Sequence, residues 1–202
     1  MKMNWLEKWG VNSPLHVIEL KQVARVALQL GGDVRGGRVL EIGCGSGLGV
    51  GLIFDLFGAS YVEAFEYDPD QLRLAQKRLL NKYEDKVKLY EASATQIPSP
   101  DNQFDAVFDF GVLHHIPDNH LAIQEVARVL KPGGRFFFQE LFSSFVMSPI
   151  IRFLTQHPPE AQFTWEELSK KLTKAGLVVS ESSCDVSSWR VVGVSRKSDH
   201  SS

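Results

Sequence analysis

The feature that constrains this chain most is a cluster of glycines directly after a short apolar segment. Ten of the 16 glycines lie between residues 31 and 58, and five of them alternate with other residues from Gly43 to Gly51. The apolar segment 38–42 precedes this alternation and is typical of a buried strand. A strand that ends in a glycine turn and leads into a helix occupies the nucleotide-binding position of an α/β sheet.

Along the rest of the chain, short segments of strand type alternate with segments of helical periodicity. We expect strands at 38–42, 61–66, 87–92, 104–110, 135–141, 177–181 and 190–194, and helices at 69–82, 122–130 and 164–175. Thr164 and Glu167 fit a capping box at the start of the last helix. Such alternation favours the α/β fold class, with a mostly parallel sheet covered by helices on both faces.

Two regions stand outside this alternation. Residues 1–30 have the pattern of an amphipathic helix, and 142–159 form an apolar, proline-broken insertion. The insertion is consistent with a lid or wall over an apolar ligand, and also with packing on the core or on a second subunit. We expect a single domain that spans residues 1–202.

Composition excludes several classes of protein. Lys and Arg number 22 against 24 Asp and Glu, a net charge of −2, whereas domains that hold nucleic-acid backbones carry a basic face. Cys44 and Cys184 are too few for a disulfide framework and lie in no metal-ligand spacing, so we predict no metal site and a reducing compartment. The chain shows no apolar run typical of a signal peptide or membrane span, which favours a cytoplasmic location.

The spacing inside the glycine loop distinguishes two kinds of nucleotide site. A nicotinamide-binding loop requires G-x-G-x-x-G. The position of its third glycine is occupied here by Leu48, three residues after Gly45, or by Val50, three residues after Gly47. The loop, which reads E-I-G-C-G-S-G from Glu41, instead resembles motif I of the class I S-adenosylmethionine-dependent methyltransferases.

Other segments resemble the same family in the same order. Glu66 ends the second expected strand and is followed by an aspartate–proline helix start, as in this family. Residues 92–105 (ASATQIPSPDNQFD), 110–118 (FGVLHHIPD) and 129–135 (VLKPGGR) are similar to three further family motifs. The resemblance implies a Rossmann-like three-layer α/β/α sandwich with a seven-stranded, mostly parallel sheet, whose last strand pair contains one antiparallel strand.

The resemblance also implies which residues bind S-adenosylmethionine. The glycine loop would approach the methionine part of the cofactor, Glu66 would accept hydrogen bonds from the ribose, and Tyr67 would lie against the adenine. Ser93 stands where many relatives have an aspartate, and its uncharged hydroxyl is a weaker acceptor. The implied cofactor-binding residues are Glu41, Gly43, Cys44, Gly45, Gly47, Glu66, Tyr67, Ser93, Ala94, Phe110 and Leu113.

Three residues are candidates for catalysis. Methyl transfer from a sulfonium is an in-line displacement, and it needs a general base only when the acceptor must lose a proton. His114, His115 and Glu140 follow or end expected strands at the ligand-binding edge. Adjacent residues at a strand end point apart, so we expect at most one histidine to face the acceptor. Structural roles for the histidines, and a solvated carboxylate at 140, are the alternatives.

The resemblance implies a methyltransferase that yields S-adenosylhomocysteine. The segment GVLHHIPD is most similar to the small-molecule branch that includes ubiquinone and menaquinone biosynthesis methyltransferases. Only residues 1–30, as a helical cap over the cofactor, and 142–159, as a lid, are left to recognise an acceptor, which favours a small, partly apolar molecule over nucleic acid. An RNA or protein methyltransferase and a non-catalytic S-adenosylmethionine-binding subunit are the alternatives, and the oligomeric state is left open.

Overall fold

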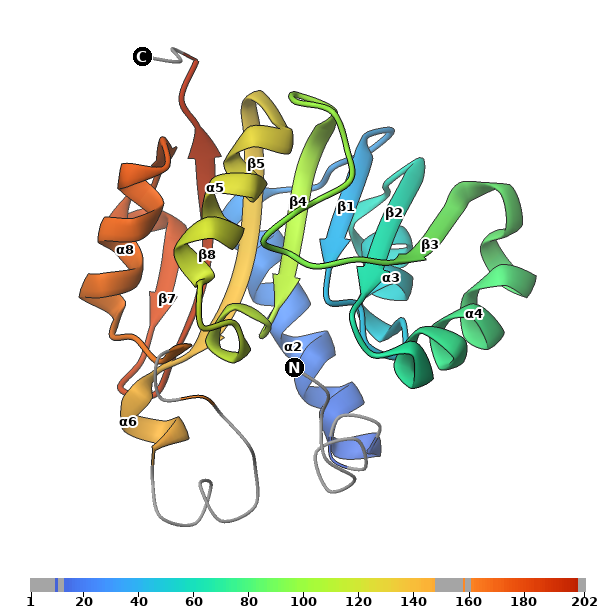
Figure 1. Cartoon of the computed structure of the whole chain (residues 1–202), viewed down its shortest axis with the longest axis horizontal. Helices are drawn as coiled ribbons and strands as arrows, with labels where there is room; N and C mark the ends of the chain where they lie inside the picture. Colours follow the sequence, from blue (N-terminus) through green and yellow to red (C-terminus); the bar gives the residue numbers. More distant parts are fainter. Residues whose placement is uncertain (1–9, 11–12, 148–157, 159–160, 200–202) are drawn as a thin grey trace.

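The computed structural model describes residues 10, 13–147, 158 and 161–199, and a single mixed sheet forms its centre (Figure 1). The strand order is β3-β2-β1-β4-β5-β8-β6, and β7 pairs with β8. The first five strands are parallel, and β8 runs antiparallel to its neighbours. The strands are β1 (Arg38–Ile42), β2 (Tyr61–Glu66), β3 (Val87–Glu91), β4 (Phe104–Phe110), β5 (Leu130–Leu141), β6 (Leu177–Val178), β7 (Cys184–Val186) and β8 (Arg190–Lys197).

Helices cover both faces of this sheet. Residues of α2, α3 and α4 pack against one face, and residues of α5 and α8 pack against the other. The helices are α2 (Pro14–Gly31), α3 (Leu48–Leu52), α4 (Pro69–Tyr83), α5 (Asn119–Val129), α6 (Ser143–Val146) and α8 (Trp165–Lys174), with a π-helical turn at Ile53–Phe57. The predicted fold class, a Rossmann-like α/β/α sandwich, is therefore confirmed.

Local side-chain hydrogen bonds mark the start of two helices. The Ser13 hydroxyl accepts a hydrogen bond from the His16 amide at the start of α2. The Thr164 hydroxyl accepts from the Glu167 amide, and the Glu167 carboxylate accepts from the Thr164 amide, so the predicted capping box is present in α8. Each cap satisfies backbone donors that the first helical turn leaves unpaired.

The sheet has eight strands among the described residues, where seven were expected. Both β6 and β7 pair with β8, β6 at Arg196–Lys197 and β7 at Val191–Gly193, so one edge position is occupied by two short strands. Between them the Ser180 amide donates to the Ser183 hydroxyl, which donates back to the Ser180 carbonyl. Serine side chains that bond the local backbone compete with the ladder, and this turn interrupts the strand predicted at 177–181.

Two parts of the expected architecture fall largely outside the described residues. These are the first residues of the N-terminal helical cap and most of the 142–159 insertion, of which α6 is the described beginning. Within the described part of the chain, no helix is both long and apolar enough to cross a membrane.

Candidate active site

The carboxyl ends of the parallel strands surround one cavity of about 1010 Å³. The glycine loop after β1, the end of β2 and residues 92–95 form one wall, and residues 110–118 after β4 form another. The N-terminal half of α2 and the end of β5 complete it. In open α/β sheets this edge is the ligand-binding edge, as the sequence predicted.

The glycines of the loop differ in what they provide. Gly43, Gly45 and Gly47 all have positive φ, a conformation that favours glycine. A Cβ on Gly43 would lie 2.6 Å from Val112 Cγ2, and one on Gly47 would lie 2.6 Å from Leu79 Cδ1, so these two glycines allow close packing. A Cβ on Gly45 would meet no atom within 4 Å. Gly45 therefore presents its backbone to open space, where a ligand can approach.

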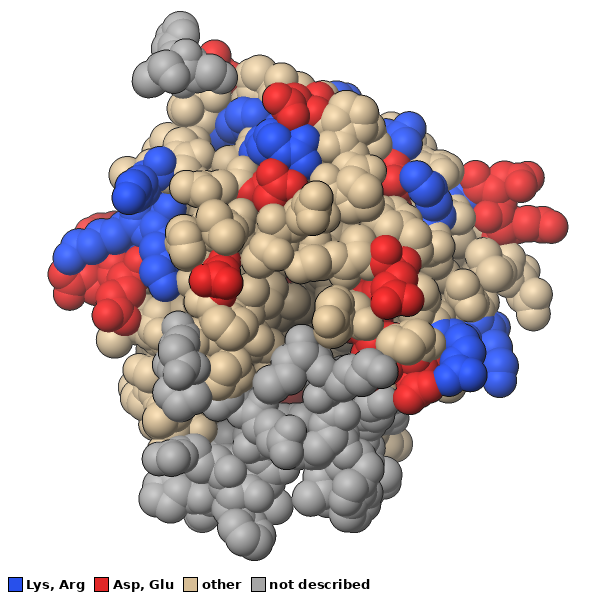
Figure 2. All heavy atoms as spheres, in the orientation of Figure 1, with Lys and Arg blue, Asp and Glu red and all other residues tan. Residues whose placement is uncertain are grey.

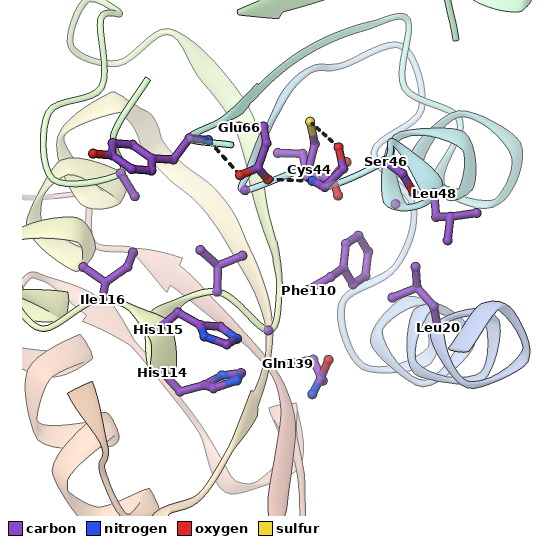
Figure 3. A pocket seen from close by; sticks show the side chains of 18 of the residues that line it. Leu20, Cys44, Ser46, Leu48, Glu66, Phe110, His114, His115, Ile116 and Gln139 are labelled. Atoms are coloured by element: carbon purple, nitrogen blue, oxygen red, sulfur yellow. Dashed lines mark hydrogen bonds between the residues drawn. The ribbon is translucent and has the colours of Figure 1, made fainter. Parts of the chain in front are cut away.

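Glu66 ties this loop to the end of β2. Its Oε2 accepts a hydrogen bond from the Gly45 amide at 2.8 Å, and its Oε1 accepts from the Tyr67 and Asp68 amides at 2.8 and 2.9 Å (Figure 3). An ionised carboxylate offers about four lone-pair sites, so these three donors leave it able to accept a further bond. Glu66 and the half-exposed Tyr67 both line the cavity, as expected for a ribose and adenine site.

Glu41 places a buried carboxyl group at the wall of the cavity. Its side chain is buried and lines the cavity, yet Oε2 has no hydrogen-bond partner within the described chain. Burial raises the pKa of Glu41 well above its ordinary value, and the nearby Glu66 and Asp109 carboxyls add to this shift. An unpartnered buried carboxyl oxygen that faces a cavity fits a cationic ligand group. The ammonium group of S-adenosylmethionine is such a group.

The two histidines lie together, contrary to the sequence expectation. They occupy the short 3₁₀ turn Leu113–His115 that follows β4, and their ring centroids are 4.3 Å apart. Both rings line the cavity, and in Figure 3 both point from the same turn towards Gln139. Adjacent residues were expected to point apart, but the chain turns here instead of continuing as a strand, so both rings reach the cavity. That at most one histidine faces the acceptor stays a prediction.

Glu140 lies behind His114, outside the cavity lining. It is fully buried on β5, and its Oε1 accepts from the Leu113 amide at 2.7 Å. Its Oε2 accepts from the His114 amide at 3.3 Å and lies 2.5 Å from His114 Nδ1. Burial raises the pKa of Glu140 to about 7 and lowers the pKa of His114 to about 4. His114 is therefore uncharged at neutral pH.

A second buried carboxyl completes this cluster. Asp109 Oδ1 accepts from the Val112 amide at 2.8 Å. Burial raises the pKa of Asp109 well above its ordinary value, and the neighbouring Glu140 carboxyl raises it further. Because the two adjacent carboxyls disfavour each other's ionisation, they do not readily carry a negative charge at the same time.

Most residues predicted for the site are brought together, and several others join them. Gly47 and Leu113, like Glu140, do not line the cavity, and the Leu113 side chain lies in the core. The remaining predicted residues line it: Glu41, Gly43, Cys44, Gly45, Glu66, Tyr67, Ser93, Ala94, Phe110, His114 and His115. Sequence reasoning expected α2 to cap the site but named none of its lining side chains, which are Leu15, His16, Glu19, Leu20 and Val23.

Comparison with known proteins agrees with this geometry. The family described as "Methyltransferase domain" matches residues 40–138. The "Ubiquinone biosynthesis O-methyltransferase" of Xanthomonas oryzae pv. oryzae (strain PXO99A) is 32% identical over 140 residues, which are 68% of this chain and 56% of that protein. The "27-O-demethylrifamycin SV methyltransferase" of Amycolatopsis mediterranei is 36% identical over 104 residues, 50% of this chain and 37% of that protein. The chain thus spans about half the length, or less, of these relatives.

Solved structures show the same fold. A SAM-dependent methyltransferase from Aquifex aeolicus superposes with a TM-score of 0.76 at 20% identity, covering 97% of this chain and 100% of that one. A putative methyltransferase of Haloferax volcanii, solved in complex with the Trm112 methyltransferase activator, gives a TM-score of 0.74 at 17% identity, covering 98% of this chain and 100% of that one.

The fold and the glycine-loop cavity, together with these matches, are those of the S-adenosylmethionine-dependent methyltransferase family. The chain belongs to the class I family of these proteins, and its cofactor is S-adenosylmethionine.

Proposed function

We propose that this protein transfers the methyl group of S-adenosylmethionine to an oxygen atom of a small, partly apolar molecule. The observation that carries the proposal is that one cavity joins the glycine loop to a second region with a different lining. That second region combines apolar side chains with polar groups that can meet a hydroxyl. Its lining includes Leu15, Leu20, Val23, His114, His115, Ile116, Gln139 and Leu141.

Oxygen as the acceptor atom is supported by the relatives. The relatives from Xanthomonas and Amycolatopsis are an O-methyltransferase of ubiquinone biosynthesis and a 27-O-demethylrifamycin SV methyltransferase. A relative from Mycolicibacterium smegmatis, 32% identical over 108 residues, is a fatty-acid O-methyltransferase. Their named substrates share an oxygen acceptor on an organic molecule, and we extend that class to this chain.

The cofactor half of the cavity would bind S-adenosylmethionine through groups already in place. Glu66 would accept hydrogen bonds from the ribose hydroxyls, with Tyr67 beside the adenine. Glu41 would meet the ammonium group with its unpartnered oxygen, and Gly45 would let the ligand approach the backbone. Ser93 and Ala94 would border the adenine, because both line the cavity beyond β3.

When bound, S-adenosylmethionine supplies a methyl group already activated by its sulfonium. The protein must then hold an acceptor oxygen in line with the carbon–sulfur bond and exclude water. Orientation of this kind can contribute about 7–11 kcal/mol to lowering a barrier. In Figure 3, Phe110 lies between the glycine loop and Leu20 of α2, and the histidine turn lies across the cavity from Leu20. The two ligands would meet in the space between them.

Charge gives little support to the RNA alternative. Figure 2 shows Lys and Arg interspersed with Asp and Glu over one face, and the described residues of that face form no continuous basic surface. Nucleic-acid-binding proteins use such a surface to neutralise phosphates. A small acceptor places no such requirement on the surface.

A binding and transfer experiment tests the proposal. Isothermal titration of the purified protein should show binding of S-adenosylmethionine and S-adenosylhomocysteine. Incubation with methyl-labelled cofactor and a panel of catechol, a long-chain fatty acid and a bulk RNA control should then give an O-methylated organic product. Lack of cofactor binding would remove the site assignment. Label in the RNA would overturn the proposed substrate class, and binding without transfer to any acceptor would favour a non-catalytic role.

A further inference from the structure

We propose that Glu140 is a positioning residue, which holds His114 with its proton on Nδ1 so that Nε2 accepts the proton of an acceptor hydroxyl. The inference rests on the proposed function, because it assigns roles within the same site. It concerns a carboxyl that does not line the cavity and could not touch an acceptor itself.

The first argument is the set of donors around Glu140. The backbone amides of Leu113 and His114 can only donate, so the carboxyl must present a lone pair to each of them. A carboxylate that accepts two backbone hydrogen bonds is favoured in its charged form. The remaining short contact, from Oε2 to His114 Nδ1 at 2.5 Å, is then best satisfied when Nδ1 carries a proton and donates it.

The second argument is the orientation of the ring. Nδ1 is held against a fully buried carboxyl, and Nε2 lies across the ring from it. The same ring lines the cavity and packs at a tilt of 37° against the His115 ring. A neutral imidazole whose Nδ1 donates to a carboxylate has a lone pair on Nε2. The geometry thus turns the basic nitrogen away from the core and towards the cavity.

The third argument is electrostatic, and it takes in the ionisable groups around the ring. Burial and the adjacent Glu140 carboxyl both raise the pKa of Asp109, so a negative charge on Asp109 is disfavoured. Glu140 accepts hydrogen bonds from two backbone amides and Asp109 from one, so Glu140 is the member of the pair better suited to carry the negative charge, and it lies directly beside His114. His115 lies on the other side of the ring. A carboxylate in this position stabilises the imidazolium that proton transfer would create.

The proposed step balances in atoms and charge. The bond from acceptor oxygen to methyl carbon forms as the carbon–sulfur bond of the methyl donor breaks. The hydroxyl proton passes to Nε2 of His114, while the Nδ1 proton stays in its hydrogen bond to Glu140. The positive charge of the sulfonium is replaced by that of an imidazolium beside a carboxylate. His114 then returns its extra proton to water.

Nitrogen NMR of the histidine rings tests the tautomer without any acceptor. The full-length protein would be labelled with ¹⁵N-histidine, and the His114 signals would be identified by their loss in His114→Gln. We expect a neutral ring protonated at Nδ1 in the wild type near neutral pH. A neutral ring protonated at Nε2, or a charged ring, would overturn the proposal. The NMR measurement needs no acceptor and does not depend on which molecule is methylated. A failure of this inference can therefore be distinguished from a failure of the proposed function.

The variant Glu140→Gln tests whether the Glu140 carboxylate sets the tautomer of His114. An amide cannot accept at both of its heavy atoms, so we expect His114 to shift towards the Nε2-protonated tautomer. With catechol as acceptor, kcat should fall about 10²-fold or more, while the Kd for S-adenosylhomocysteine stays within about twofold. With 4-nitrocatechol, whose hydroxyl is more acidic, the loss should be smaller. Equal losses with both acceptors would show that Glu140 acts only on structure.

The chain offers a matched control for this substitution. Glu166→Gln makes the same chemical change on the exposed face of α8, where Glu166 pairs with Lys170. It should alter neither the His114 tautomer nor turnover. If Glu140→Gln does not fold, the wild-type NMR measurement alone decides the proposal.

Discussion

Replacing Gly49 by alanine is expected to push a methyl group into the wall that carries Glu41. An added Cβ would overlap Glu41 Oε1 and would lie 2.7 Å from Phe110 Cδ2. Both are far inside van der Waals contact, and the Glu41 side chain is buried, so the carboxyl or helix α3 must move. Overpacking of this kind costs about 1–3 kcal/mol. The helical preference of alanine over glycine offsets about 1 kcal/mol, leaving a net loss of up to about 2 kcal/mol.

The neighbouring Gly51 provides the control, because it lies in the same short helix. A Cβ there would meet only Tyr83 Oη, at 3.9 Å, so Gly51→Ala should be neutral or stabilise by up to about 1 kcal/mol. Thermal unfolding of a chain this size shifts about 2–4 °C per kcal/mol, so the two variants should separate clearly. Gly49→Ala should also weaken S-adenosylmethionine binding in isothermal titration, since it displaces Glu41. Equal melting temperatures and equal affinities for the two variants would refute the reasoning.

Three further substitutions test individual contacts. Glu66→Ala removes a charged acceptor and the bond to the Gly45 amide, and should weaken S-adenosylmethionine binding by about 1–3 kcal/mol, roughly 5- to 150-fold in Kd by titration. Arg78→Ala removes hydrogen bonds to the Ser46 carbonyl and hydroxyl, and should lower the urea midpoint by the equivalent of about 1 kcal/mol. Because burial raises the pKa of Glu41, a bound cation should expel its proton. The affinity for S-adenosylmethionine should then rise with pH. Because the released proton is taken up by the buffer, the heats of the isothermal titration should depend on the buffer, and Glu41→Gln should abolish both effects.

The sequence predicted which residues gather around the glycine loop, because the determinants of that arrangement are local. Gly43, Gly45 and Gly47 need positive φ within one turn, and Glu66 follows the loop at a fixed distance along a strand–helix–strand unit. The register of parallel strands β1 and β2 then brings Glu66 to the Gly45 amide without further information.

Other features could not be predicted from any single segment of the sequence, because most of them depend on packing between segments that are far apart in the chain. The placement of Glu140 behind His114 requires the register between β4 and β5, together with a 3₁₀ turn that the sequence pattern did not signal. The split edge strand depends on serine side chains at 180 and 183 that bond the backbone locally. Residues of α2 became cavity lining only because that helix packs across β5 and β8.

Four neighbouring strands each carry a buried acid at or next to their last residue, and this shared position explains the chemistry of the site. The four are Glu41 on β1, Glu66 on β2, Asp109 on β4 and Glu140 on β5. These carboxyls disfavour one another's ionisation: burial and the neighbouring acids raise the pKa values of Glu41 and Asp109 well above their ordinary range. A cation bound above Glu41 and Glu66 would relieve that repulsion, whereas Glu140 is already compensated by backbone amides and His114. In the proposed reaction, Glu41 and Glu66 would therefore attract the cationic cofactor, and Asp109 and Glu140 would stabilise the positive charge that moves onto His114.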